Sequence, residues 1–318
     1  MTLRLGAVFI VSLVATLIVI PPFIRYLQRI QLFQVVSQYS LKEYQEKAKT
    51  PIMGGLAFVI IPLLVMIVFF WQEVFTPKLV VILLSFLCYG FVGFLDDFRI
   101  VAQHDNKGLS VRQKLFLQLI LAIAMYLIYR ETMNSDLYVP LLNINLYLGA
   151  GYAFLMFFMF VGASNAVNIT DGMDGLAGGT TVLALVPFIF LALRAGDEPV
   201  AGFALALAGS LLGYLRYNLK PARIFMGDTG SLALGAALAA LAIVLKQELL
   251  LAVIGFVFVY ETFCVILQQI WVRVFHKRIF AYTPIHYAFK LRGYREEAIV
   301  GGFWLLGLVC AIIGLILA

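Results

Sequence analysis

Charged side chains are scarce in this sequence of 318 residues. Asp, Glu, Lys and Arg make up 13% of it and hydrophobic residues 63%, whereas a typical soluble domain has about 25% charged residues. A water-soluble globule is therefore excluded, and we expect the chain to lie in a lipid bilayer.

Histidine and cysteine are also rare, with three residues of each. The cysteines all fall in apolar runs (Cys88, Cys264 and Cys310), so neither a disulfide framework nor a zinc site is indicated. The strict alternation of apolar and polar residues that marks outer-membrane barrels is missing as well. These absences leave helical membrane spans as the expected structure.

A membrane-spanning helix needs about 20 apolar residues. Ten such segments follow one another along the chain, at about 3–24, 52–71, 78–95, 114–130, 148–166, 175–194, 199–215, 230–245, 249–272 and 298–317. We predict an all-α polytopic membrane protein with about ten transmembrane helices in one integral-membrane domain, residues 1–318. The first segment is interpreted as a retained span rather than a signal peptide, and residues 136–148 as an ordered connector rather than a hairpin.

Lysine and arginine predict the orientation. The connections between successive segments lie alternately on the two sides of the membrane. Five of the 23 Lys and Arg residues lie on the side that carries both termini, namely Arg4, Lys78, Arg130, Arg194 and Lys246. The other 18 lie in or beside the connections of the opposite side, which the positive-inside rule makes cytoplasmic, with both termini outside. This bias accounts for most of the net charge of +6 and gives no reason to expect nucleic-acid binding.

Carboxylates gather on the same predicted face. Six of the eight aspartates fall in its connections: Asp96, Asp97, Asp105, Asp171, Asp174 and Asp228. Unpaired carboxylates at the end of a membrane span are costly, so we expect a bound cation or a basic partner. Oxygen ligands with few histidines indicate Mg²⁺, or Mn²⁺, rather than zinc. Neighbouring glycines such as Gly172 and Gly227 permit close backbone approach to a phosphate.

Five motifs resemble the polyprenyl-phosphate phospho-N-acetylhexosamine transferases. They are TPIMGG (50–55), GFLDDF (93–98), NAVNITDGMDGLAGG (165–179), FMGDTGSLALG (225–235) and TPIHYAFKLRGYREE (283–297). Within that superfamily, the last motif is similar to the branch that transfers phospho-N-acetylmuramoyl-pentapeptide. The resemblance implies ten helices with both ends outside, Mg²⁺ dependence and a homodimer in the bacterial cytoplasmic membrane.

The resemblance also implies roles for residues. The catalytic candidates are Asp96, Asp97, Asp228 and His286, with Asp228 as the metal ligand and Asp96, Asp97 and Asp171 as further possible ligands. The substrate-binding candidates, including the uridine pocket, are Lys47, Asn168, Asp171, Gly172, Met173, Asp174, Asn218 and Phe225. Glu261, an acid in the ninth apolar segment, is expected to make a structural hydrogen bond.

The implied reaction joins undecaprenyl phosphate to the sugar-side phosphorus of UDP-N-acetylmuramoyl-pentapeptide, giving lipid I and UMP for peptidoglycan synthesis. One departure bears on it, because the family's three consecutive histidines are here His286, Tyr287 and Ala288. The alternatives are a UDP-GlcNAc:polyprenyl-phosphate GlcNAc-1-phosphate transferase, an inactive binding paralogue and a transporter. Which of Asp96 and Asp97 acts as a base, and whether the displacement is direct or covalent, stays open.

Overall fold

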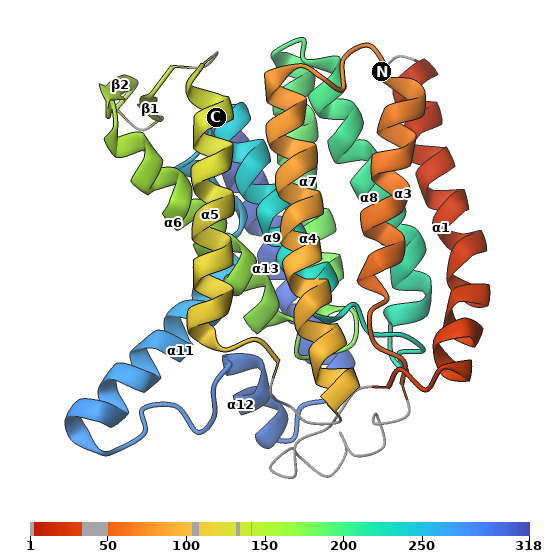
Figure 1. Ribbon diagram of the computed structural model, residues 1–318. Helices are drawn as coiled ribbons and strands as arrows, with labels where there is room; N and C mark the ends of the chain where they lie inside the picture. The colour runs from red at the N-terminus through yellow and green to blue at the C-terminus, as the bar shows by residue number, and fades with distance from the viewer. Residues whose placement is uncertain (1–2, 34–49, 104–107, 132–133, 141) are drawn as a thin grey trace.

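The computed structural model describes residues 3–33, 50–103, 108–131, 134–140 and 142–318. The chain runs up and down through a bundle of helices, and both ends of the chain lie at the same end of the bundle (Figure 1). The helices are α1 (Leu3–Arg29), α3 (Gly55–Phe69), α4 (Pro77–Gln103), α5 (Val111–Arg130), α6 (Gly151–Thr170), α7 (Leu176–Arg194), α8 (Glu198–Asn218), α9 (Gly227–Val244), α10 (Leu250–Ile254), α11 (Phe256–Phe275), α12 (Ile285–Leu291) and α13 (Glu296–Leu317).

Each of the ten apolar segments forms a helix. Within the described ranges, nine helices are long and apolar enough to cross a membrane, and α3 is a shorter apolar helix. The prediction of an all-α polytopic membrane protein is thereby confirmed. The ninth segment differs in detail because it is broken at Gly255 into α10 and α11, and the lower end of α11 leans away from the bundle (Figure 1).

The prediction of a connector at 136–148 was wrong. Strands β1 (Asp136–Val139) and β2 (Ile144–Tyr147) pair in antiparallel register, with Asp136 opposite Tyr147. Asn143 adopts a positive φ of 51°, a conformation that asparagine tolerates, in the turn between them. This hairpin lies at the end of the bundle that carries the chain termini (Figure 1).

Helix α9 forms the centre of the bundle. From Thr229 to Val244 every residue is buried, and most are Ala, Leu or Gly. Small side chains let the neighbouring helices come close. A Cβ atom on Gly93 of α4 would collide with the backbone of Asp228, and one on Gly55 of α3 would collide with the backbone of Gly230. The start of α9 is therefore held tightly between α3 and α4.

Candidate active site

Asp97 caps the start of α9 from the neighbouring helix α4. Its Oδ1 accepts a hydrogen bond from the backbone N–H of Asp228 (3.0 Å), and its Oδ2 accepts from the backbone N–H and the hydroxyl of Thr229 (3.0 and 2.6 Å). The first N–H groups of a helix have no partner within the helix, so a carboxylate placed there stabilises them. Asp97 is 1% exposed, and both of its oxygens are engaged in this contact.

Lys114 of α5 joins two other carboxylates of the predicted site. Its Nζ lies 2.6 Å from Asp228 Oδ2 and 3.2 Å from Asp96 Oδ1. Asp96 Oδ1 also accepts from the backbone N–H of Leu109 at 2.8 Å. The sequence predicted the aspartates of the site but not their contact with Lys114. Its place at the start of an apolar span, in a face rich in Asp, was the available signal.

Asn168 completes the surroundings of Asp228. Its side-chain nitrogen donates to Asp228 Oδ1 (2.6 Å) and to Ser231 Oγ (2.9 Å). Both oxygens of Asp228 thus have polar partners, one on α5 and one on α6. The structure thus brings three of the predicted residues together, Asp96, Asn168 and Asp228. Asp97 lies next to them, at the start of α9.

The loop after α6 carries four more of the predicted residues, Asp171, Gly172, Met173 and Asp174. Asp171 caps the end of α6, and the side chain of Met173 is buried. Asp174 Oδ2 accepts from the backbone N–H of Ala222 at 3.0 Å. The structure therefore ties this loop to the segment that leads into α9.

Asn218, at the end of α8, strengthens that link. Its Oδ1 accepts from the backbone N–H of Gly175 (3.0 Å), and its Nδ2 donates to the carbonyl of Ile224 (2.9 Å). Glu296 of α13 accepts from the backbone N–H of Asp174 (3.1 Å) and lies 3.0 Å from Lys220 Nζ. Burial favours the neutral amine of Lys220, but the hydrogen bond and charge of Glu296 outweigh it, so the pKa of Lys220 is raised.

Phe225 lies between this loop segment and the entry to α3. Its backbone N–H donates to the carbonyl of Pro51 and its carbonyl accepts from Gly54, both at 2.8 Å. Its ring packs against the small apolar cluster that contains Ile52 and Met53. Lys47, the remaining predicted substrate contact, lies outside the described residues.

His286 belongs to a second group of residues, built from α11 and α12. Both His286 and Glu261 are fully buried, and His286 Nδ1 lies 3.1 Å from Glu261 Oε1. Glu261 Oε2 accepts from the backbone N–H of Ile285 at 2.9 Å, as expected for a structural hydrogen bond. The hydroxyl of Tyr287 donates to the carbonyl of Gly172 at 3.1 Å, which links this group to the loop after α6.

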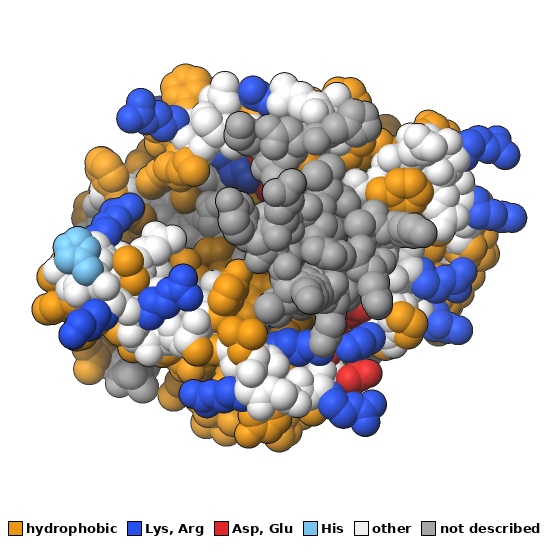
Figure 2. All heavy atoms as spheres, turned by 90° about the horizontal axis from the view of Figure 1, so that it is seen from below, with side chains coloured by type: hydrophobic (Ala, Val, Ile, Leu, Met, Phe, Trp, Pro, Cys, Tyr) orange, Lys and Arg blue, Asp and Glu red, His pale blue; other side chains and the backbone are white. Residues whose placement is uncertain are grey.

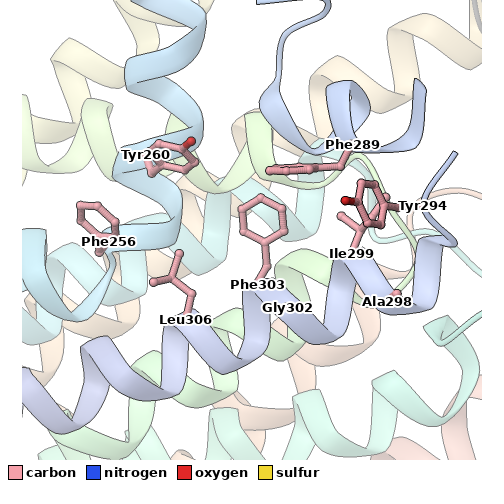
Figure 3. A pocket seen from close by; sticks show the side chains of 9 residues that line it. All are labelled: Phe256, Tyr260, Phe289, Tyr294, Ala298, Ile299, Gly302, Phe303 and Leu306. Atoms are coloured by element: carbon pink, nitrogen blue, oxygen red, sulfur yellow. The ribbon is translucent and has the colours of Figure 1, made fainter. Parts of the chain in front are cut away.

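The face of the bundle that carries these residues is basic at its rim. Figure 2 shows Lys and Arg side chains around its edge, where few Asp and Glu are visible. Beside α12, a cavity of about 610 Å³ lies between α11, α12 and α13. Its lining is almost entirely apolar, with Phe256 and Tyr260 from α11, Phe289 from α12, and Phe303 from α13 (Figure 3).

This arrangement suits phosphate chemistry. Mg²⁺ takes oxygen ligands and commonly uses one or two carboxylates together with substrate phosphates. Asp228 and Asp96 provide two carboxylates, and the ammonium group of Lys114 between them shows that a positive charge is stable there. The residues present therefore fit a Mg²⁺ or Mn²⁺ ion.

The sequence matches the family described as glycosyl transferase family 4 over residues 79–246, a range that contains Asp96, Asp97, Lys114, Asn168 and Asp228. It is 41% identical to the phospho-N-acetylmuramoyl-pentapeptide-transferase of Geobacillus sp. (strain WCH70) over 309 residues, which is 96% of this chain and 95% of that protein. The chain belongs to the phospho-N-acetylmuramoyl-pentapeptide-transferase family.

Other members of this transferase family show the same extent of similarity. The protein of Oceanobacillus iheyensis is 43% identical over 96% of this chain and 95% of its own length. That of Bacillus subtilis is 41% identical over 96% of this chain and 94% of its own length. Together with the nine apolar helices found in the described ranges, this kinship makes the chain a multi-pass protein of the bacterial cytoplasmic membrane.

Proposed function

We propose that this protein transfers phospho-N-acetylmuramoyl-pentapeptide from its UDP derivative to undecaprenyl phosphate, producing lipid I and UMP for peptidoglycan synthesis. The names of the relatives favour this substrate over UDP-GlcNAc. The observation that carries the proposal is the meeting of Asp96, Asn168 and Asp228 around Lys114 at one end of the bundle. A transporter would need its acids near the middle of the membrane instead.

In this reaction an oxygen of the polyprenyl phosphate attacks the sugar-side phosphorus of the UDP derivative. A new phosphorus–oxygen bond forms, and the bond between the two phosphates of UDP breaks, so UMP leaves with the electron pair. One diphosphate replaces another, so positioning and neutralisation of charge matter more than proton transfer. A phosphate monoester is largely ionised at neutral pH, so removing its last proton contributes little.

The residues divide this work between them. Asp228 and Asp96 would hold Mg²⁺ or Mn²⁺, which would neutralise developing phosphate charge. Asp171 remains a further candidate ligand. Lys114 contributes a fixed positive charge beside the same carboxylates. Asp97 holds the start of α9, and with it Asp228, in place; because both of its oxygens are engaged, we favour Asp96 for any role as a base.

We assign the uridine pocket to the loop after α6 and to Phe225. The hydrogen bonds from Asp174 and Asn218 to neighbouring backbone hold Gly172–Asp174 beside the segment that carries Phe225. The apolar cavity beside α12 and the basic rim suit the lipid acceptor and its phosphate (Figures 2 and 3). The cytoplasmic location of this face and the homodimer are part of the same proposal.

The test is release of UMP by purified protein. UDP-N-acetylmuramoyl-pentapeptide and UDP-GlcNAc would each be supplied with undecaprenyl phosphate and Mg²⁺. With the lipid acceptor present, we expect UMP release from UDP-N-acetylmuramoyl-pentapeptide and none from UDP-GlcNAc. Release from UDP-GlcNAc but not from the muramoyl derivative would contradict the proposed substrate. Release of UMP without the lipid acceptor would contradict a direct transfer.

A further inference from the structure

A buried carboxylate connects α11 to the start of α12. Glu261 lies within the apolar helix α11 and is fully buried. One of its oxygens accepts from the backbone N–H of Ile285, and the other lies 3.1 Å from His286 Nδ1. Within the described part of the chain, neither His286 Nδ1 nor Glu261 Oε1 has a hydrogen-bond partner of good geometry, so their 3.1 Å approach is a charge contact between the carboxylate and the ring. Glu261 therefore faces one edge of the imidazole directly.

The opposite edge of the imidazole faces the loop after α6. His286 Nε2 has no hydrogen-bond partner among the residues that the structure describes. A Cβ atom added to Gly172 would collide with this nitrogen and would also meet the Tyr287 hydroxyl, so only glycine permits the approach. The Tyr287 hydroxyl meanwhile donates to the carbonyl of Gly172. The imidazole is thus enclosed between Glu261 and the proposed uridine loop.

This geometry favours one arrangement of hydrogens on the His286 ring. A carboxylate only accepts hydrogen bonds, so its approach to Nδ1 favours a hydrogen on that nitrogen in both the neutral and the charged imidazole. Nε2 is then the atom left for a further partner. An unpartnered polar atom in a buried position is costly unless a ligand supplies a hydrogen bond.

We propose that Glu261 is a positioning residue for the transfer reaction, acting through His286. It holds the imidazole so that Nε2 meets a hydrogen-bonding group of the sugar nucleotide beside Gly172. Tyr287, which stands where the family has a second histidine, instead holds the Gly172 carbonyl through its hydroxyl. This inference rests on the proposed function, because it assigns the donor nucleotide to the Gly172 loop.

The substitution Glu261→Gln separates this role from a structural one. The amide oxygen of glutamine still accepts from the N–H of Ile285, while its NH₂ group faces Nδ1 and favours the imidazole with its hydrogen on Nε2. We expect kcat/KM and UDP affinity to fall by about 10- to 100-fold, as when partners that orient metal-binding histidines are removed. The thermal unfolding midpoint should change little.

A double-mutant cycle with His286→Gln tests whether Glu261 acts through the imidazole. If it does, Glu261→Gln should have almost no further effect in the His286→Gln chain. The matched control is Gln268→Met on the same helix, since Gln268 also accepts backbone N–H groups of the following loop, those of Ile279 and Phe280. Gln268→Met should change kcat/KM by the same factor whether residue 286 is His or Gln. Equal losses from Glu261→Gln in both backgrounds would overturn the proposal.

UDP binding measured by calorimetry gives the same cycle without turnover. Absence of transfer in the wild-type chain would contradict the proposed function, while the binding cycle would still decide the role of Glu261. Gly172→Ala changes the other side of the contact with His286, and it provides a second test if Glu261→Gln does not fold. Its added methyl should weaken UDP binding strongly beside His286 and much less in the His286→Ala chain. Equal weakening in both chains would place the imidazole away from the nucleotide.

Discussion

Asp228 has a partner for each of its carboxylate oxygens, Lys114 on one side and Asn168 on the other. Replacing it with Asn preserves the shape but removes the negative charge proposed to hold the metal. We expect Asp228→Asn to lower kcat by about 10²-fold or more, the scale of losing one strong electrostatic contributor. Raising the Mg²⁺ concentration should not restore it. UMP release is the measurement, and near-normal release would remove Asp228 from the metal site.

The matched control is Asp136→Asn. Asp136 lies in β1 at the opposite end of the bundle, where its carboxylate accepts a hydrogen bond from Asn134. The substitution makes the same chemical change, so activity should stay within the error of the assay. A loss in this variant comparable to that of Asp228→Asn would show that the assay reports general damage to the protein.

Lys114 provides a test of metal binding that needs no turnover. Removing its ammonium group leaves Asp96 and Asp228 without their shared cation. Unpaired, partly buried charges are costly, so Lys114→Gln should lose about 1–3 kcal/mol of stability in the absence of divalent cations. Mg²⁺ should recover part of that loss.

The measurement is the thermal unfolding midpoint with and without Mg²⁺. We expect a larger increase on adding Mg²⁺ in Lys114→Gln than in the wild type, and no such increase when Asp228→Asn is added to the same chain. If Mg²⁺ raises the midpoint equally in all three proteins, the ion binds elsewhere.

Helices α4 and α9 cross at Gly93, where the backbone of Asp228 leaves no room for a side chain. A methyl group there must push α4 away and disturb the hydrogen bonds from Asp228 and Thr229 to Asp97. Gly93→Ala should therefore lower the free energy of unfolding by about 1–3 kcal/mol, as overpacking does in cores, and lower activity with it. Chemical denaturation and UMP release measure the two effects.

Gly301→Ala is the control at the scale of a helix. Gly301 lies in α13, where an added Cβ atom would meet nothing within 4 Å among the residues that the structure describes. Alanine in an open helical position removes a conformational-entropy cost and should raise stability by about 0.5–1 kcal/mol. If Gly93→Ala is as harmless as Gly301→Ala, the α4–α9 crossing is not as tight as the structure has it.

The helices themselves could be predicted because each needs only an apolar run of sufficient length. The break at Gly255 and the β1–β2 hairpin could not, since an isolated glycine or a short alternation has several possible structures. The aspartates of the candidate site were apparent from their number on one face. Two contacts could not be predicted, because each joins residues that are far apart in the sequence and lie on different helices. Lys114 contacts Asp228, 114 positions away, and Glu261 contacts His286, 25 positions away.

At the scale of the whole molecule, the charge difference between the two ends of the bundle predicts its orientation. The five Lys and Arg residues of the smaller set lie toward the hairpin end and the termini, and those members of the larger set that the structure describes lie at the site end. The positive-inside rule then predicts that α12 faces the cytoplasm and that the hairpin lies outside. In that orientation, a nucleotide from the cytoplasm would reach the proposed site without crossing the membrane.

Two single-cysteine additions test this orientation, Tyr147→Cys in β2 and Arg295→Cys before α13. Both positions are highly exposed, at 80% for Tyr147 and 85% for the side chain of Arg295, so their reactivities should differ only through the membrane. A membrane-impermeant maleimide should label Tyr147→Cys in intact cells and Arg295→Cys only after permeabilisation. The unmodified chain is the control, because Cys264 and Cys310 are buried and Cys88 is half-buried. The reverse labelling pattern would place the Asp96–Asp228 site outside the cell and would contradict the proposed orientation.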